Sequence, residues 1–334
     1  MKILIATGLY PPDVGGPAEY AKNLHDEFVR LGHKVRVVSY TRIERFLPFG
    51  VRHFYYFLRL VRHMFGVDFV LSLDLISVGF PSVCATSLFG KKNVIRVGGD
   101  FLWEAYVERT GKLIPLSNFY KKNHKLNLKE KLIYRLMKFT LCHSSHLAFN
   151  SDWQRNILIP EHGLNREKTS VILNFIGEKL PSEPAVEKNF IWAVRPIKLK
   201  NGANLEKAFL EAQKVDPNIS LDDRTTSHDE LFERLKSCYA VILPSVSEVS
   251  PNLIFDAIRF GKPFIVTKET GAYEMLKGIG LFVDPLNLDD IAEKIIMLSD
   301  DKMYQMYQSK VESFSMKHSW GEVANEFLNL FKKK

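Results

Sequence analysis

The stretch AVILPSVSEVSPNLIFDAIRFGKPFIVT, residues 240–267, contains the pattern that decides the fold. Its two ends, AVILP and FIVT, are short apolar runs of the kind that form buried strands. Between them, Ser250 suits a helix N-cap, Pro251 suits the first helical position and Gly261 suits the helix end. The stretch therefore predicts a strand, a loop, a helix and a second strand, with Glu248 in the loop.

The same alternation of strand and helix recurs along the whole chain. In the first half, the apolar runs KILIATG, KVRVVSY, FVLSL and NVIRVGG alternate with amphipathic segments. In the second half, FIWAV, AVILP, FIVT and LFVDP do the same, with helices expected over 202–214 and 228–236. This spacing predicts parallel sheets joined by crossover helices, and its repetition predicts two such domains.

Length and composition are those of a globular protein with two domains. The chain has 334 residues, of which 46% are hydrophobic and 25% charged, and that length can bury two full cores. Its three cysteines form no C-x-x-C pair, which argues against a disulfide framework or a zinc site and fits a reducing cytoplasm. The N-terminus predicts a first strand rather than a signal peptide. Residues 69–90 are long enough to span a bilayer, but Asp74 and Pro81 favour a buried strand followed by a helix.

The net charge of +8 is concentrated in the first half of the chain. Residues 1–150 carry 22 Lys and Arg against 11 Asp and Glu, a net charge of +11. Residues 151–334 carry 24 against 27, a net charge of −3. We therefore expect the first half to face an anionic partner, either a membrane surface or nucleic acid, and no recognition motif supports nucleic acid.

Two loops at predicted strand ends contain residues suited to binding phosphate. In GLYPPDVGGPAEYAKNL, Gly15 and Gly16 precede a helix, where missing Cβ atoms let backbone N–H groups approach an oxyanion. This loop is neither a G-x-G-x-x-G fingerprint nor a P-loop. In WAVRPIKLKNGANL, Arg195 at the strand exit and Lys200 before the next helix suit a diphosphate. Taken alone, the first motif is more simply explained as a plain turn, and either Arg195 or Lys200 as part of a solvated basic loop.

The third such loop is the one that holds Glu248. Its carboxylate suits hydrogen bonds from sugar hydroxyls, and the backbone amides that open the following helix suit phosphate. Asp256, inside that helix, suits a ribose diol, as carboxylates do in nucleotide-binding folds. A helix-dipole partner and a solvated helix face are the simpler explanations of the two carboxylates. The donor-binding residues expected in this loop and helix are Glu248, Ser250, Pro251, Asn252, Leu253 and Asp256.

Together the loops resemble those of the GT-B glycosyltransferases of family four, a large retaining family that uses nucleotide-sugar donors. YPPDVGGPAEYAKNL is similar to the family's N-terminal glycine loop, and VRPIKLKNG to its Arg…Lys-Gly phosphate loop. PSVSEVSPNLIFDAIRFGKPFIVTKETG is similar to its E-x7-E signature, and SWGEVANEFLNLF to its closing helix. The resemblance implies an α/β fold of two Rossmann-like, doubly wound parallel-sheet domains facing a cleft. We expect an acceptor domain over 1–172, a donor domain over 173–316 and a C-terminal helix over 317–334 that packs back toward the first domain.

The resemblance also implies a retaining hexosyltransferase. It would move a sugar from a UDP- or GDP-sugar to a hydroxyl acceptor, either lipid-linked or a growing cell-surface glycan. Glu248 would contact the transferred sugar and Asp256 the ribose. Arg195, Lys200 and helix N-terminal amides would offset the charge of the leaving group. Because no Asp-x-Asp signature is present, we expect no metal, and no cofactor beyond the nucleotide-sugar co-substrate.

Asp100 is the candidate residue at the acceptor hydroxyl. It follows NVIRVGG, at the place where many family members have a histidine. Gly98 and Gly99 before it would leave space for a ligand, and a turn-stabilising Asp is the simpler explanation. The expected catalytic residues are thus Asp100, Arg195, Lys200 and Glu248.

Two departures from the family pattern leave alternatives open. Asp256 stands where the family usually has Glu, which shortens the reach by one methylene. Around DPNISLDDRTTSHDEL a helix and a strand of the family are missing, so we expect a trimmed donor domain. Both departures fit a non-catalytic sugar- or lipid-binding relative, and a nucleotide-sugar epimerase of the same fold is a further alternative. A dinucleotide oxidoreductase is disfavoured, because the first loop lacks the fingerprint spacing.

Two basic segments of the first half predict peripheral binding to the cytoplasmic face of a membrane. Residues 41–66 contain five Arg and one Glu among Phe, Tyr and Leu, and residues 112–138 contain eight Lys and Arg and one Glu. Core-packed helices with a basic outer face are the simplest explanation. Basic, aromatic stretches also lie in bilayer interfaces, where each Lys or Arg near anionic lipid contributes roughly 1 kcal/mol.

Overall fold

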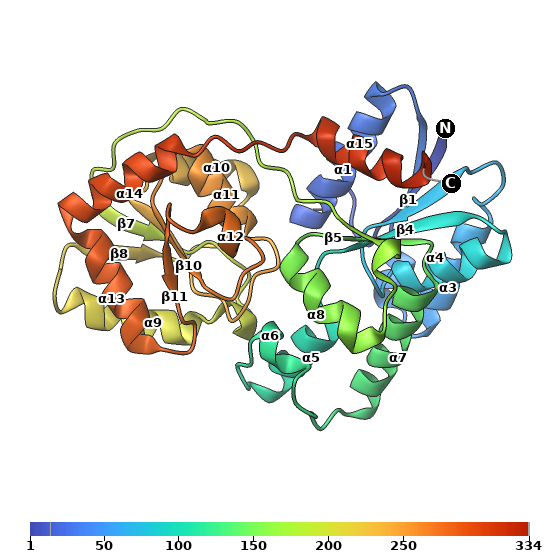
Figure 1. The fold of residues 1–334 in the computed structure, drawn as a ribbon, viewed down its shortest axis with the longest axis horizontal. Helices are drawn as coiled ribbons and strands as arrows, with labels where there is room; N and C mark the ends of the chain where they lie inside the picture. Colours follow the sequence, from blue (N-terminus) through green and yellow to red (C-terminus); the bar gives the residue numbers. More distant parts are fainter. Residues whose placement is uncertain (14, 333–334) are drawn as a thin grey trace. The chain divides into compact units, whose positions relative to one another are not determined.

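The structure, a computed structural model, describes residues 1–13 and 15–332. The chain forms two compact bodies, each built on one parallel sheet (Figure 1). The first body contains Met1–Leu102, Lys125–Asn174 and the C-terminal residues from Ser319 onward. The second body contains Trp103–His124 and Phe175–His318. Two parallel sheets with crossover helices are the predicted pair of Rossmann-like domains, so the fold class is confirmed.

The first body has a six-stranded sheet in the order β2-β1-β3-β4-β5-β6. Its strands are β1 (Lys2–Ala6), β2 (Lys34–Val38), β3 (Phe69–Ser72), β4 (Lys92–Val97), β5 (His146–Phe149) and β6 (Thr169–Val171). Its helices are α1 (Gly16–Arg30), α2 (Arg42–Phe46), α3 (Val51–Val61), α4 (Gly79–Leu88), α7 (Leu128–His143), α8 (Asp152–His162), the 3-10 turn η1 (Arg166–Lys168) and α15 (Trp320–Lys332).

Strand residues of the first sheet point alternately to two apolar layers. Ile3 and Ile5 of β1 share one layer with α1 and α15. Leu4 and Ala6 share the other with α3 and α4. This period of two, with helices on both sides, is what a doubly wound parallel sheet requires.

Residues 69–90 form β3 followed by α4, as predicted. Across residues 1–13 and 15–332, none of the helices has both the length and the apolar character needed to cross a bilayer.

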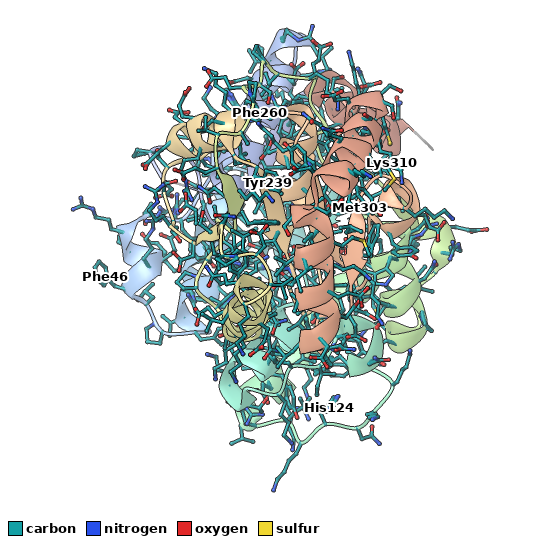
Figure 2. All side chains as sticks on the ribbon, turned by 90° about the vertical axis from the view of Figure 1, so that its left-hand side faces the viewer. Phe46, His124, Tyr239, Phe260, Met303 and Lys310 are labelled. Atoms are coloured by element: carbon teal, nitrogen blue, oxygen red, sulfur yellow. The ribbon has the colours of Figure 1, made fainter. Side chains whose placement is uncertain are left out.

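The basic segment 41–66 forms α2 and α3. Its one carboxylate, Glu44, is buried, where it accepts hydrogen bonds from Thr41 and pairs with Arg59. Tyr56 points into the core, whereas Phe46 is 87% exposed and projects from the body (Figure 2). The segment thus combines a core-packed face with an exposed basic and apolar one.

The second body has a five-stranded sheet in the order β11-β10-β9-β7-β8. Its strands are β7 (Lys188–Ile191), β8 (Ile219–Asp222), β9 (Ala240–Leu243), β10 (Phe264–Thr267) and β11 (Leu281–Val283). Its helices are α5 (Phe101–Thr110, from Trp103 onward), α6 (Leu116–Phe119), the 3-10 turn η2 (Lys198–Lys200), α9 (Gly202–Gln213), α10 (His228–Ser237), α11 (Asn252–Arg259), α12 (Tyr273–Leu276), α13 (Leu288–Ser299) and α14 (Asp301–Ser313).

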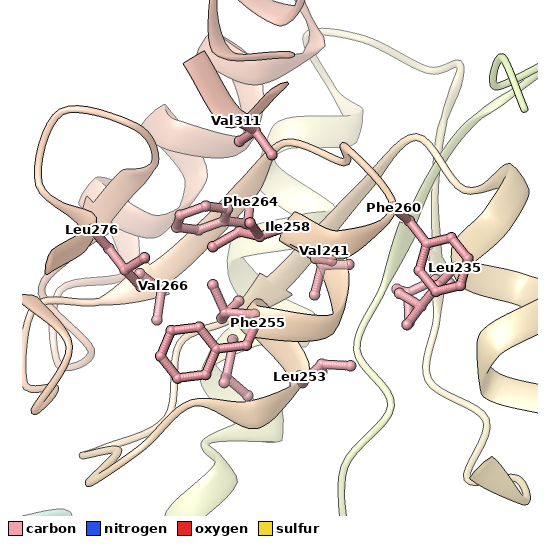
Figure 3. Packing of buried hydrophobic residues seen from close by; sticks show 14 of the residues in the cluster. Leu235, Val241, Leu253, Phe255, Ile258, Phe260, Phe264, Val266, Leu276 and Val311 are labelled. Atoms are coloured by element: carbon pink, nitrogen blue, oxygen red, sulfur yellow. The ribbon is translucent and has the colours of Figure 1, made fainter. Parts of the chain in front are cut away.

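Helix α11 packs on one face of the second sheet. Its Phe255 and Ile258 share an apolar cluster with Val241 of β9 and Val266 of β10 (Figure 3). Helices α9 and α13 cover the other face, where Ile242 points. The predicted strand–helix–strand unit is therefore anchored by the core on both of its strands.

Helix α11 begins one residue later than predicted. Pro251 is its N-cap rather than its first residue, and the Pro251 carbonyl accepts a hydrogen bond from the Ile254 N–H at 2.9 Å. The reason is the backbone of Pro251, whose ψ of 76° lies outside the helical region. The helix exit is as predicted, since Gly261 follows α11 with a φ of 65°, which suits glycine.

The connection from β8 to β9 contains one helix. Strand β8 leads through one loop into α10 and then β9, and this sheet has one strand fewer than the first. Asp222, at the end of β8, accepts hydrogen bonds from Arg224 and from Arg234, each at 2.9 Å. These guanidinium groups, Arg224 first, lower the pKa of Asp222 to about 2. Strands β6 and β8 were not predicted, because both are short and partly exposed.

Candidate functional site

The loops that leave β7, β9 and β10 are tied together at the carboxyl edge of the second sheet. The Val246 N–H donates to the Leu199 carbonyl at 2.9 Å, which joins the β9 and β7 loops. The Glu248 N–H donates to the Glu269 carbonyl, and the Gly271 N–H to the Glu248 carbonyl, each at 2.9 Å. The β9 loop is therefore held on both sides. In parallel sheets this edge is where ligands bind.

Lys200 and Glu248, predicted in separate loops, are brought together at this edge. Lys200 Nζ donates to Glu248 Oε1 at 2.5 Å, with the two side chains 20% and 10% exposed. Asn201 fixes the turn after Lys200. It adopts a φ of 64°, and its Nδ2 donates to the carbonyls of Pro244 and Pro285 at 2.9 and 2.7 Å. The ammonium thereby stays beside the carboxylate, next to the N-terminus of α9.

Arg195 lies in the loop between β7 and η2, not at the end of a strand. Strand β7 ends at Ile191, three residues earlier than FIWAV predicted, because the chain leaves the ladder after Trp192 donates to the Asp222 carbonyl. The Arg195 side chain is exposed, and it has no hydrogen bond or ion pair with any residue that the structure describes. Its guanidinium is thus open to a ligand.

Helix α9 starts with Gly202 because the Trp192 side chain lies too close for any larger residue. A Cβ on Gly202 would lie 2.5 Å from the indole ring of Trp192. The first turn of α9 contains no acidic residue, so its amides and its dipole remain favourable to an anion.

The remaining donor-loop residues lie around the start of α11. Asn252 and Leu253 open the helix after Ser250 and Pro251, and its first turn contains no acidic residue. The Ser250 hydroxyl is 3.5 Å from Asn252 Oδ1, and the Leu253 side chain is part of the core. The backbone amides that open α11 therefore suit phosphate.

Asp256, the expected ribose ligand, is engaged by its own helix. Arg259 Nη1 donates to Asp256 Oδ1 at 3.1 Å, and the two side chains are 15% and 19% exposed for Arg259 and Asp256. This is the ordinary spacing of an i,i+3 pair. A ribose at Asp256 would have to share the carboxylate with Arg259.

Gly15, Gly16 and Asp100 belong to the first body. Gly15 is the N-cap of α1 with a φ of 128°, a conformation that requires glycine, and α1 starts at Gly16. Asp100 is buried, only 1% exposed, between β4 and α5. Both loops follow parallel strands of the first sheet and therefore lie at its carboxyl edge.

Arg96, which the sequence did not single out, fills the space beside Gly98. Its guanidinium lies 3.9 Å from the centre of the Tyr20 ring and donates to Asn174 Oδ1 at 2.8 Å. A Cβ on Gly98 would be 2.8 Å from Arg96 Nη1. Gly98 therefore makes room for a cation of the chain itself. The sequence signal that could have pointed to Arg96 is its position as an arginine within an apolar strand.

The segment Trp103–His124, which we call the α5–α6 arm, packs on the carboxyl edge of the second sheet. Glu108 Oε1 accepts a hydrogen bond from the Leu199 N–H at 3.1 Å, and the Glu108 carbonyl accepts one from Lys198 Nζ at 2.8 Å. The arm thus holds the loop that contains Arg195 and Lys200.

The same arm also contacts the loops of β9 and β10. The Leu116 N–H donates to Ser247 Oγ at 3.0 Å, and Ser117 Oγ donates to Glu269 Oε2 at 2.6 Å. Ser247 directly precedes Glu248. Sequence patterns gave no signal for the contacts of the arm, since they join residues between 90 and 152 positions apart.

Comparison with known proteins points to one family. Residues 195–301 match the family described as glycosyl transferases group 1. Over 109 residues the chain is 30% identical to an uncharacterized glycosyltransferase of Methanocaldococcus jannaschii, covering 31% of this chain and 28% of that protein. Over 108 residues it is 25% identical to the N,N'-diacetylbacillosaminyl-diphospho-undecaprenol alpha-1,3-N-acetylgalactosaminyltransferase of Campylobacter jejuni, covering 31% and 29%. These alignments span less than a third of each curated relative.

Solved structures resemble the chain over its whole length. Sucrose-phosphate synthase of Thermosynechococcus elongatus has a TM-score of 0.70 at 11% identity, covering 99% of this chain and 98% of that one. HepE of Anabaena, in complex with UDP and glucose, has a TM-score of 0.67 at 15% identity, covering all of both chains. At such identities the likeness concerns the fold. Residues 195–301 thus match the glycosyl transferases group 1 family, and the chain as a whole has the GT-B fold of two Rossmann-like domains.

Proposed function

We propose that this protein transfers a sugar from a nucleoside-diphosphate sugar to a hydroxyl group, with retention of the anomeric configuration. The observation that carries the proposal is the Lys200–Glu248 pair at the carboxyl edge of the second sheet. The ammonium of Lys200 and the open guanidinium of Arg195 suit a diphosphate beside the α9 N-terminus. Glu248 suits hydrogen bonds from the hydroxyls of the attached sugar. The family match over 195–301 supports the proposal, because it covers this edge.

The proposed donor is a UDP- or GDP-sugar. The amides that open α11, from Asn252 onward, would contact its phosphates. The ribose would lie at Asp256, in competition with Arg259. The solved HepE structure contains UDP and glucose, which makes UDP-glucose a sensible first donor to test.

The proposed reaction is a same-face displacement at the anomeric carbon. The bond from that carbon to the phosphate oxygen breaks, and a bond to the acceptor oxygen forms on the same face. The acceptor proton passes to the departing phosphate oxygen. Arg195, Lys200 and the amides of α9 and α11 would stabilise the charge that develops on the diphosphate, which is why we propose a reaction without metal. Asp100 of the first body would position the acceptor hydroxyl.

The proposed acceptor is lipid-linked, and the protein would act at the cytoplasmic face of a membrane. The Campylobacter jejuni relative is named for a diphospho-undecaprenol substrate, which supports this class of acceptor. The charge of +11 on residues 1–150 supports the membrane side of the proposal. A growing cell-surface glycan is the second acceptor class.

One observation favours a non-catalytic sugar-binding relative as the second candidate. The carboxylate of Asp256 is already paired with Arg259, so the ribose contact has a competitor within the helix. Such a protein would bind nucleotide sugars and release no nucleoside diphosphate.

An activity assay with a panel of sugar donors distinguishes the glycosyltransferase from the non-catalytic relative and from an epimerase. The protein would be incubated with UDP- and GDP-sugars and a polyprenyl-phosphate-linked sugar, with and without EDTA. Nucleoside diphosphate is measured, and the product anomer is assigned by NMR. We expect diphosphate release, an unchanged anomeric configuration and no effect of EDTA. Epimerised donor without release indicates an epimerase, and binding without turnover indicates the non-catalytic relative. Activity restored only by a divalent metal would contradict the proposed charge stabilisation.

A further inference from the structure

An apolar groove opens in the first body between α3, α4 and α7. Its volume is about 390 Å³, which is within the range of small-molecule pockets, roughly 300–1,000 Å³. None of the described residues that line it is Asp, Glu, Lys or Arg. Its walls are built mainly by Phe49, Phe54, Phe57, Phe80, Leu132 and Leu136.

The two titratable groups in the groove are kept uncharged at neutral pH. Burial lowers the pKa of His53 to about 4, so its ring is neutral, and its Nδ1 accepts the Gly50 N–H at 3.2 Å. Burial raises the pKa of the Cys84 thiol, which favours its protonated form. The groove therefore offers no charge to bind a nucleotide, a sugar phosphate or a peptide carboxylate.

Helix α7, one wall of the groove, exposes cations and hides its carboxylate. Lys129, Lys131, Arg135 and Lys138 are all exposed. The helix's only carboxylate, Glu130, is buried, where it accepts the Asn127 N–H in a capping box. The charged side chains that this wall exposes to solvent are therefore all basic.

Helix α3, another wall of the groove, and the preceding helix α2 show the same arrangement. Their one carboxylate, Glu44 of α2, is buried and paired with Arg59, whereas Arg42 and Arg62 are exposed. Large apolar side chains are exposed beside them, including Phe46 at 87% (Figure 2) and Phe54 at 63%. Both walls thus present positive charge and apolar surface together.

An occupant of this groove must be apolar in one part and anionic in another. We propose that the groove binds one hydrocarbon chain of an anionic membrane lipid, whose phosphate lies at the basic residues of α7. The phenyl and leucyl walls match a hydrocarbon chain, and the cations on α7 match the phosphate by charge. The inference rests on the membrane association proposed above, and it adds the place where a lipid enters the protein.

Cys84 provides a reporter inside the groove. Of the three cysteines, Cys142 is exposed and Cys238 is buried. In a Cys142→Ser protein, Cys84 is therefore the thiol to follow. The rate of its modification by a small uncharged disulfide reagent would be measured with and without monomeric oleoyl lysophosphatidic acid. At a lipid concentration ten times its Kd, mass action gives about tenfold protection.

Two further probes and two variants make the assay specific. Glycerol 3-phosphate carries the charge without the chain, and monooleoylglycerol carries the chain without the charge. We expect no protection from the first and weaker protection from the second. Leu132→Asp places a charge at the groove wall and should abolish protection. Leu88→Asp, at an exposed leucine of α4 outside the groove, should keep it.

Circular dichroism checks that each variant is folded. If a variant does not fold, the comparison of the three probes on the protein with native groove residues still tests the inference. Absence of protection by the lysolipid, or equal protection by glycerol 3-phosphate, would overturn the inference. An equal loss of protection in Leu132→Asp and Leu88→Asp would also overturn it. The assay contains no sugar donor, so it tests the groove separately from sugar transfer. A protein that binds the lysolipid but transfers no sugar would refute the proposed function, and the inference that the groove binds lipid would still stand.

Discussion

At the scale of single residues, the ion pair between Lys200 and Glu248 holds two charged side chains at the carboxyl edge of the second sheet. Each side chain alone would be costly to desolvate, and together they lie largely out of water at the exits of β7 and β9. Removing one partner leaves the other uncompensated. A variant of either residue is therefore expected to affect ligand binding and local stability together, which a double-mutant cycle separates.

Glu248→Ala and Arg195→Ala should each lower turnover about a hundredfold, as loss of one electrostatic stabiliser typically does. Steady-state kinetics with the best donor would measure the loss. Glu274→Ala is a suitable control, because Glu274 is 78% exposed and pairs with Lys277 on its own helix. Full activity of either site variant would contradict its assignment to the site.

At the scale of secondary-structure elements, the α5–α6 arm is the part of the second body that comes from the first half of the sequence. It provides Glu108, Leu116 and Ser117 to the loops of three strands. The loops that contain Arg195, Lys200 and Glu248 are therefore held by residues more than ninety positions away.

Glu108→Ala should lower the free energy of unfolding by about 1.5–3 kcal/mol, the typical contribution of a hydrogen bond to a charged group. Glu108→Gln should lose less, because the amide oxygen still accepts the Leu199 N–H. Urea unfolding measures both. Glu211→Ala, which removes an exposed i,i+3 pair with Lys214, is the matched control. Equal effects of Glu108→Ala and Glu211→Ala would mean that the arm is not held by Glu108.

The β8–α10 connection predicts a response to acid. The pKa of Asp222 is about 2 in the folded protein, below the ordinary value of 3.8 for an aspartate, because Arg224 and Arg234 favour the carboxylate. A lowered folded-state pKa stabilises the protein above pH 3.8, and this contribution is lost as the pH falls toward 2. Asp222→Asn should therefore be less stable at pH 6 and show a weaker loss of stability between pH 4 and 2. Parallel curves for the two proteins would contradict this account.

The sequence predicted the strands well where apolar runs were fully buried and missed them where exposed residues interrupt the run. FIVT was placed as found, because all four of its residues are buried. Strand β8 was missed because Ser220 is exposed within it. The meeting of Lys200 with Glu248 depends on which strands lie side by side, and the arm contacts depend on packing across long separations. Neither is encoded by local spacing.

At the scale of the whole molecule, charge is distributed unevenly along the chain. The first half carries +11 and the second −3. Helices α2 and α7 expose basic residues of the two segments from which membrane binding was predicted, among them Arg42, Lys129 and Lys131, and the one carboxylate of each helix is buried. An anionic bilayer is the partner that suits such a surface.

Binding to liposomes should therefore require anionic lipid and should be released by salt. At 1 M salt the screening length falls to about 3 Å, which removes most of the attraction between exposed charges and the bilayer. Co-sedimentation with neutral and anionic vesicles measures the effect. A Lys129→Glu and Lys131→Glu double variant should bind less, whereas Lys310→Glu, outside these segments, should bind as the wild type does. Equal binding to neutral vesicles would contradict the electrostatic account.

We propose that the carboxyl edge of the second sheet binds a nucleoside-diphosphate sugar, and a thermal-shift titration measures this binding without requiring turnover. The wild-type protein and Lys200→Ala would be titrated with UDP, GDP and their sugar derivatives. A ligand at a hundred times its Kd stabilises a protein by about 2.7 kcal/mol. We predict that one nucleotide series raises the melting temperature of the wild type and shifts Lys200→Ala far less at equal concentration. No shift with any of these ligands, or an equal shift in both proteins, would contradict the account.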